Sequence, residues 1–539
     1  MADTHSEDRK DYNKHDGTDR RESDRGDDAD LFVTDSHQKE GFGKAAIQII
    51  VGALLFAALA GGYLWWANRT HAAHMLVLDA RPLVEKADVA SLEAARDKFQ
   101  EALDTKGGDE KAIAGMAETY TLLWILHGLD VYESDARRFL DDAKGNNIQR
   151  AERYFADAMV AYHEGRHDDS IAIAKEVLDR GGVSERLNWT LGLSLRAQGK
   201  VKIGRDNLRK AQDSRSGAPH YSLALGDAYE DDNDPRNASH YWSIALNANS
   251  KYVAAAARDI LTRNRKGEAI EALEADLKKL DELSDDVTGK VGRAAIALSR
   301  SAVLYRRGHT KEAAAAADKA IELAGESGMA LHARGIALIA DGKAKKKGVA
   351  DIEAAYEKSP GALKYFYAAA QVLSEEGKHD KALKLLNTEE EKLAQIPQFH
   401  TAVGDVWLAK RDYGKATAAY DKALKINDRY PEALLGMGNA FWQQRKYDDA
   451  TSWFEKAVGA RRQFPEVYEA IGLMWIEQGA TTQANPQLEE AEKIYLSRGT
   501  DAVTMNGFYV RVIKALAAKK ASSLITGWVA REKAFREGS

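Results

Sequence analysis

The feature that most constrains the fold of this chain is a repeat of 34 residues in its C-terminal part. A proline, a glycine and an alanine each recur three times at this step, with apolar residues at matching positions between them. A fixed period of this length, in which small and large apolar residues alternate, is typical of stacked helix–turn–helix units. The recurring positions are Pro397, Pro431 and Pro465; Gly404, Gly438 and Gly472; and Ala416, Ala450 and Ala484.

The spacing inside each repeat predicts two packed helices. Ala416, Tyr420 and Ala423 lie at i, i+4 and i+7, which places them on one helix face. Small residues where two helices cross allow a close approach, and one such pair cannot bury its apolar face without neighbours. With a small residue inside the first helix and Ala-x-x-x-aromatic-x-x-Ala on the second, residues 397–498 resemble the tetratricopeptide repeat (TPR) family. The resemblance implies an all-α superhelical solenoid, and the recurring pattern indicates about twelve helix–turn–helix units, some of them weak matches.

The chain divides into five predicted regions. Residues 1–43 form a charged tail that lacks the apolar surface needed to fold. A transmembrane helix follows at 44–68, then an N-terminal solenoid half at 69–282 and a C-terminal half at 283–498. A polar loop at 281–290 is the candidate break between the halves. Residues 499–539 no longer fit the repeat and predict a capping helix or helix pair.

Residues 45–67 predict contact with a lipid bilayer. The stretch AAIQIIVGALLFAALAGGYLWWA contains Gln48 as its single polar side chain and reaches about 34 Å as a helix, enough to cross a bilayer. A cleaved signal peptide is the alternative, but such signals have short basic leaders, and a long acidic segment precedes this one. Ala53, Ala57 and Gly61 form a small-residue stripe on which two membrane helices can pack, which suggests a possible homodimer. Lysines and arginines on the two sides of the helix are nearly balanced in number, so they do not decide its orientation in the membrane. A short charged tail is a poor candidate for translocation when a large C-terminal region follows. We therefore expect a cytoplasmic tail and periplasmic repeats in a bacterial inner membrane.

Composition excludes several classes of site. The net charge of −6 lies entirely in residues 1–40, which hold 13 acidic and 7 basic residues. Acidic and basic residues are equal in number in the rest of the chain, so the sequence gives no reason to expect general affinity for nucleic acid. The chain has no cysteine, so it has neither disulfides nor thiolate metal ligands. No nucleotide-binding glycine motif occurs, and the sequence predicts no cofactor and no enzymatic activity.

One motif has the form of a metalloprotease signature. His163-Glu164-Gly165-Arg166-His167 matches H-E-x-x-H, which holds zinc only when both histidines lie on one continuous helix. The repeat register instead places Gly165 in the turn between two helices. The motif therefore predicts a turn, and a zinc hydrolase remains only as an alternative.

The family resemblance also implies a partner-binding surface. In TPR proteins the first helix of each unit lines a concave groove that binds peptides or partner helices. The alternative is that these side chains pack against the capping helix. A chaperone-type carboxylate clamp does not fit, because Leu435 stands where that clamp needs a cation. The groove positions are Lys364, Tyr367, Gln371, Thr401, Asp405, Leu408, Leu435, Asn439, Trp442, Glu469, Leu473 and Ile476.

These expectations combine into a single-pass, membrane-anchored TPR scaffold. Such a protein mediates protein–protein interactions in the assembly of an envelope complex for secretion, motility, biogenesis or translocation. The alternative within the same fold is a cytosol-facing receptor for client proteins. Because Trp442 is large and apolar, it is the predicted anchor of the groove, and Phe441 is the predicted core residue beside it.

Overall fold

The fold of the chain is entirely helical in the part that the structure describes. The computed structural model describes residues 38–215 and 217–538, and no β-strand occurs within these ranges. The chain divides into two compact units, residues 1–68 and 69–539. The tail predicted to be disordered lies outside the described residues up to position 37, whereas residues 38–43 belong to the first helix.

The first unit is described as one helical segment. Helix α1 runs from Gln38 to Lys86, so it extends 18 residues past the predicted end of the membrane helix at residue 68. Among the described residues it is the one helix long and apolar enough to cross a bilayer. Its large apolar side chains between Ile47 and Trp66 are exposed.

The C-terminal part of α1 belongs to the second unit, which the repeat pattern in the sequence did not predict. Ala73, Val77, Ala80 and Val84 are buried and join one core with residues of α2 (Val89–Thr105). Their spacing places them on one face of a helix. Arg69–Lys86 is therefore the first helix of the first repeat pair.

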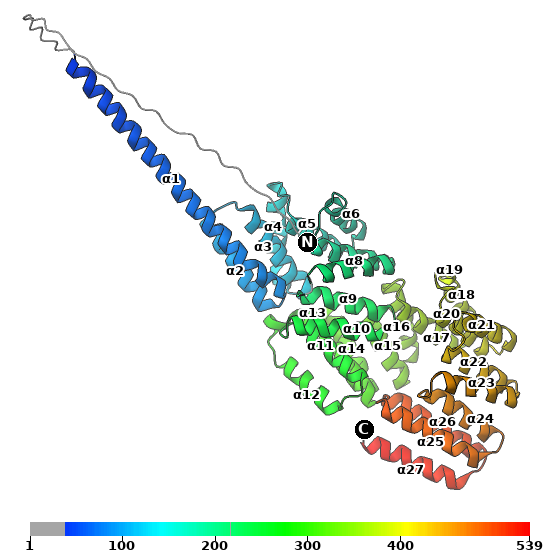
Figure 1. The fold of residues 1–539 in the computed structure, drawn as a ribbon. Coiled ribbons are helices and arrows are strands. Elements are labelled where there is room, and N and C mark those ends of the chain that lie inside the picture. Colours follow the sequence, from blue (N-terminus) through cyan, green and yellow to red (C-terminus); the bar gives the residue numbers. More distant parts are fainter. Residues whose placement is uncertain (1–37, 216, 539) are drawn as a thin grey trace, which may run out of the picture. The chain divides into compact units, whose positions relative to one another are not determined.

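Eleven further pairs follow, which confirms the predicted count of about twelve (Figure 1). The N-terminal helices are α3 (Glu110–Thr121), α4 (Glu133–Gly145), α5 (Ala151–His163), α6 (His167–Leu178), α7 (Glu185–Ala197), α8 (Val201–Ser214), α9 (Pro219–Asp231), α10 (Pro235–Ala248), α11 (Val253–Arg265) and α12 (Ile270–Asp281). Between α3 and α4 lie a π-helical turn at Leu122–Leu126 and a 3-10 turn at Asp130–Tyr132.

The C-terminal pairs and the cap complete the described chain. They are α13 (Asp285–Arg307), α14 (Thr310–Ala324), α15 (Gly328–Asp341), α16 (Lys345–Lys358), α17 (Leu363–Glu375), α18 (His379–Asn387), the short α19 (Glu390–Leu393), α20 (Pro397–Ala409), α21 (Tyr413–Ile426), α22 (Pro431–Gln443), α23 (Tyr447–Ala460), α24 (Pro465–Glu477), α25 (Thr481–Ser497), α26 (Ala502–Ala518) and α27 (Ser522–Gly538). The last two helices, α26 and α27, pack on each other, and their role as a cap stays a prediction.

The repeating glycines exist because a ring or branched side chain of the second helix fills the space where their Cβ atoms would lie. A Cβ atom on Gly438 would lie 2.4 Å from the Phe454 ring, and one on Gly404 would lie 2.5 Å from the Tyr420 ring. A Cβ atom on Gly472 would lie 2.6 Å from the Leu488 side chain. The repeat therefore preserves a close approach of two helices rather than a backbone conformation.

The polar loop predicted at 281–290 is much shorter than expected. Only residues 282–284 separate α12 from α13, which starts at Asp285 and is interrupted by a kink at Gly289. Gly289 has a φ of +61° there, and a Cβ atom at this position would lie 2.0 Å from the carbonyl oxygen of His127. This close approach joins α13 to the N-terminal pairs, and residues 69–539 form one compact unit. The division into two halves at 282–283 stays a prediction.

Candidate partner-binding cavity

Four of the predicted groove residues, Thr401 of α20 among them, meet in one cavity of about 570 Å³. Tyr367 and Gln371 come from α17, and Asp405 comes from α20, the next first helix along the chain. These two helices contact each other directly because first helices of successive pairs are neighbours in the stack. The full lining is Tyr367, Ala370, Gln371, Ser374, Glu375, Gln398, Thr401, Ala402, Asp405, Val406, Ala409, Tyr430 and Glu432.

The polar side chains of the cavity are held in place by short hydrogen bonds. The Tyr420 hydroxyl donates to Asp405 Oδ1 at 2.7 Å, and Gln371 Nε2 donates to Glu375 Oε1 at 2.8 Å. Thr401 Oγ1 donates to the Pro397 carbonyl oxygen at 2.9 Å. Tyr420 on α21 thus fixes the position of the Asp405 carboxylate on α20, the first helix of the same repeat.

The lining carries three carboxylates and no lysine or arginine. Glu432 forms an ion pair with Arg461 at 2.8 Å, which lies outside the cavity. Surrounding protein raises the pKa of Asp405 above its ordinary value, although the Tyr420 bond opposes the rise. The Asp405 side chain is nevertheless exposed to solvent at the cavity. The cavity is therefore an acidic site lined by hydroxyl and amide groups.

Two polar atoms of the lining are buried without a hydrogen-bond partner in the described part of the chain. They are the hydroxyl oxygen of Tyr367 and Oε2 of Glu432. Burial also raises the pKa of Tyr367, which keeps this hydroxyl group protonated. Buried polar groups are nearly always paired, so these atoms mark a place where water or a ligand supplies the missing bonds.

Lys364 does not belong to this cavity, contrary to the groove prediction. Its ammonium group pairs with Glu230 at 2.5 Å, and Arg265 binds the same carboxylate at 2.5 Å. The neighbouring Tyr365 hydroxyl donates to Asp231 at 2.9 Å. The start of α17 is thus attached to the end of α9, which lies 134 residues away in sequence. Lys364 is therefore engaged in an ion pair, and it lines a separate cavity of about 430 Å³ together with Glu230 and Arg265.

Four further predicted groove residues lie outside the cavity and are half-buried: Leu408, Leu435, Asn439 and Trp442. The indole N–H of Trp442 donates to Glu477 at 2.7 Å. The rings of Trp442 and Phe441 both pack against the core that α22, α23 and α24 form. Phe441 is half-buried too, whereas Phe454 is completely buried in the same core. The anchor role of Trp442 stays a prediction.

The last three predicted groove residues are covered by the cap, which was the alternative. Glu469 is 6% exposed and binds Arg511 of α26 at 2.5 Å and Tyr495 of α25 at 3.0 Å. Ile476 is 1% exposed and shares a core with α26, and Leu473 packs against that core. Glu469 and Ile476 are therefore not open groove residues, because α26 occupies the surface where a partner would lie.

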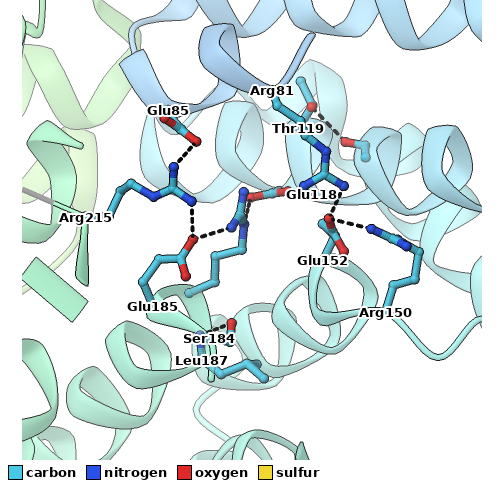
Figure 2. Close-up of polar contacts among 12 residues, drawn as sticks. Arg81, Glu85, Glu118, Thr119, Arg150, Glu152, Ser184, Glu185, Leu187 and Arg215 are labelled. Carbon is cyan, nitrogen blue, oxygen red and sulfur yellow. Dashed lines mark hydrogen bonds and ion pairs between the residues drawn. The ribbon is translucent and has the colours of Figure 1, made fainter. Parts of the chain in front are cut away.

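In the N-terminal pairs, ion pairs fill the space between successive first helices (Figure 2). Arg81 of α1 binds Glu152 of α5 at 2.7 Å, and Arg150 binds the same carboxylate at 3.3 Å. Glu118 of α3 is 4% exposed and accepts a short hydrogen bond from Arg186 of α7. The carboxylate raises the pKa of Arg186 despite its burial, so the guanidinium stays charged.

Arg215 extends the same network at its edge. It pairs with Glu85 at 2.7 Å and with Glu185 at 3.6 Å, as Figure 2 shows. The space that these residues enclose is about 10 Å³, which is about one water molecule. This space is therefore an internal polar core with no room for a peptide. A separate cavity of about 480 Å³ lies beside it, lined in part by α5, α7 and α9.

The H-E-x-x-H sequence is divided between two helices, as predicted. Helix α5 ends at His163, α6 begins at His167, and Gly165 between them has a φ of +76°. Glu164 accepts from Arg137 at 2.9 Å and from Arg166 at 2.6 Å. In residues 38–215 and 217–538, no group of three or more acidic or histidine side chains is arranged to hold a metal ion.

The groove prediction missed several residues that line the cavity. Glu375 lies one turn after Gln371 on α17, a spacing that the sequence shows plainly. Tyr430 and Glu432 flank Pro431 at the start of α22 and close one end of the cavity, and only the packing of the next pair reveals this. Ser374 and Gln398 complete the polar lining.

Comparison with known proteins identifies the repeat. The tetratricopeptide repeat family model matches at residues 367–433, 401–467 and 435–495. No curated protein matches the chain in sequence. Solved structures similar to it include the APC/C hetero-tetramer Cut9–Hcn1 (13% identity, 83% of this chain and 96% of that chain, TM-score 0.39) and yeast Tom70 (13%, 84% and 96%, TM-score 0.36). A human IFIT1 dimer with m7Gppp-AAAA is similar at 15% identity over 70% of this chain and 90% of that chain, with a TM-score of 0.39.

The family match covers the region in which the sequence repeat is strongest, and it contains the whole lining of the acidic cavity. Proteins built from this repeat are interaction scaffolds that bind protein partners on the surface formed by their stacked helices. Residues 367–495 of this chain are therefore tetratricopeptide repeats.

Proposed function

We propose that this protein is a membrane-anchored scaffold that binds a segment of a partner protein in the cavity between α17 and α20. The observation that carries the proposal is the cavity of about 570 Å³ inside the matched repeats. This volume lies in the range of specific binding sites. Elsewhere in the predicted groove Lys364 is engaged in an ion pair, and α26 covers Glu469 and Ile476. We therefore place the partner segment in this cavity, where several of the groove residues meet.

The partner site is tested by photo-crosslinking from the cavity. A photoreactive amino acid at Gln371, which is exposed and lines the cavity, is expected to capture a partner protein in the cells that produce this chain. The matched control is the same amino acid at Lys422, an exposed position on α21 outside the lining. Ala402→Trp fills the cavity and is expected to abolish capture at Gln371. Equal capture at both positions, or capture that survives Ala402→Trp, contradicts the proposal.

The anchor is proposed from the apolar part of α1. Between Ile47 and Trp66 the helix presents exposed large apolar side chains, which are unfavourable in water and favourable in a bilayer. We place the anchor in a bacterial inner membrane, with the tail cytoplasmic and the repeats periplasmic, where the scaffold assembles an envelope complex. Ala53, Ala57 and Gly61 lie exposed on this helix, and a homodimer through them remains part of the proposal.

Removing residues 1–67 is expected to move the protein from the membrane to the soluble fraction. The full chain should stay with membranes after carbonate extraction, whereas the truncated chain should be soluble and retain its helical circular dichroism. Protease added to intact spheroplasts tests the side on which the repeats lie, and degradation of the repeats is expected. A truncated chain that still pellets with membranes would show that another segment binds lipid.

A further inference from the structure

Two carboxylates of the acidic cavity, Asp405 and Glu375, form no ion pair with the described residues. Asp405 receives its hydrogen bond from the neutral hydroxyl of Tyr420, and Glu375 receives one from the neutral amide of Gln371. In the described ranges, neither carboxylate has a lysine or arginine within 4 Å. Glu432 uses one oxygen for Arg461 and leaves Oε2 without a partner. An uncompensated acidic surface inside a concavity attracts a positively charged group.

Hydrogen bonding at the cavity points to the same occupant. Glu432 Oε2 is an acceptor, and the Tyr367 oxygen accepts as well as donates, so a donor-rich group satisfies both atoms. Lysine and arginine side chains carry three and five N–H donors and no acceptor. The rings of Tyr367 and Tyr430 also line the cavity and add attraction for a cation that lies over them.

The volume argues for a chain segment rather than a free ion. A space of about 570 Å³ holds several residues and is far larger than one ammonium group. Two lysines of this chain's own basic run, residues 343–347, are already engaged: Lys345 binds Glu376 at 2.7 Å, and Lys347 lies 3.9 Å from Asp318. The occupant therefore comes from another protein.

We propose that the cavity between α17 and α20 binds a basic segment of a partner protein and holds one lysine or arginine side chain between Asp405 and Glu375. This inference rests on the proposed function and specifies the chemistry of the partner. Asp405 lies one turn from Thr401 on α20, so the cation enters where the lining is most polar. Specificity then comes from the position of the carboxylates rather than from the overall charge of the protein.

The test uses a fluorescein-labelled tetralysine peptide and the full chain in detergent at low salt, with fluorescence anisotropy as the readout. Asp405→Asn keeps an acceptor for Tyr420 and removes the charge, and it is expected to weaken binding about tenfold. Glu375→Gln is a second variant on an exposed side chain and is expected to act in the same direction. The matched control is Glu455→Gln, an exposed carboxylate on α23 outside the cavity, which should leave binding unchanged. The same peptide with acetylated lysines should not bind.

Three results would overturn the inference: no binding of tetralysine, equal weakening by Glu455→Gln, or undiminished binding by both cavity variants. Helical circular dichroism establishes that each variant is folded before binding is compared. Crosslinking from Gln371 with excess tetralysine separates this inference from the proposed function. Undiminished capture of the partner would retain the partner site and reject its basic occupant. Absence of any partner, together with Asp405-dependent tetralysine binding, would reject the partner site and retain the basic preference.

Discussion

Glu118→Ala is expected to destabilise the N-terminal repeats by about 3 kcal/mol, because it leaves a buried guanidinium without its main partner. Glu118 is 4% exposed, and the side chain of Arg186 is 12% exposed, so water cannot replace the lost carboxylate. Glu185, at 2.6 Å from Arg186, retains part of the compensation. The loss should appear as a lower unfolding midpoint and as faster amide hydrogen exchange in α3, α5 and α7.

A double variant shows whether the cost comes from the unpaired charge. Glu118→Ala combined with Arg186→Met removes both charges and is expected to recover a large part of the stability, since apolar side chains often replace buried ion pairs without loss. The control is Glu101→Ala, because Glu101 is an exposed residue of α2 that lies 3.5 Å from Lys98. Exposed pairs contribute little, so we expect a change under about 0.5 kcal/mol. A double variant less stable than Glu118→Ala would contradict this account.

Phe454→Ala is expected to cost about 3 to 5 kcal/mol locally, the usual range for a buried phenylalanine. Phe454 is 0% exposed, and its ring lies against Gly438, where no side chain can replace it. The cavity left behind lies between α22 and α23, so hydrogen exchange should increase in these helices and in α24. Repeat arrays unfold in neighbouring units, and α3 to α8 should be nearly unchanged.

The matched control for Phe454→Ala lies on the same helix. Gly459 is near the end of α23, and a Cβ atom there would meet nothing within 4 Å. Gly459→Ala should therefore stabilise the helix by about 0.5 to 1 kcal/mol through the higher helix propensity of alanine. Unchanged hydrogen exchange of α22 in Phe454→Ala would show that the Phe454 ring does not hold α22 and α23 together at Gly438.

Part of the cavity lining could be predicted from the sequence. The family register correctly brings Tyr367, Gln371 and Asp405 to one place, because first helices of successive repeats are neighbours. The same register fails for Lys364 and Glu469, because their partners, Glu230 and Arg511, lie outside the local repeat. A repeat pattern describes one unit and its neighbours, and it contains no information on contacts between distant units.

The sequence by itself determined the repeating unit of this protein. The 34-residue step, the glycines opposite Tyr420 and Phe454 and the turn at Gly165 all depend on contacts within one helix pair, which local spacing describes. Only the tertiary structure decided which surfaces stay open. The attachment of α17 to α9, the ion pairs of Glu118 and the cover that α26 places over Glu469 join residues far apart in the chain. Such contacts depend on the curvature accumulated over many units, and small rotations per unit sum to a geometry that no single repeat encodes.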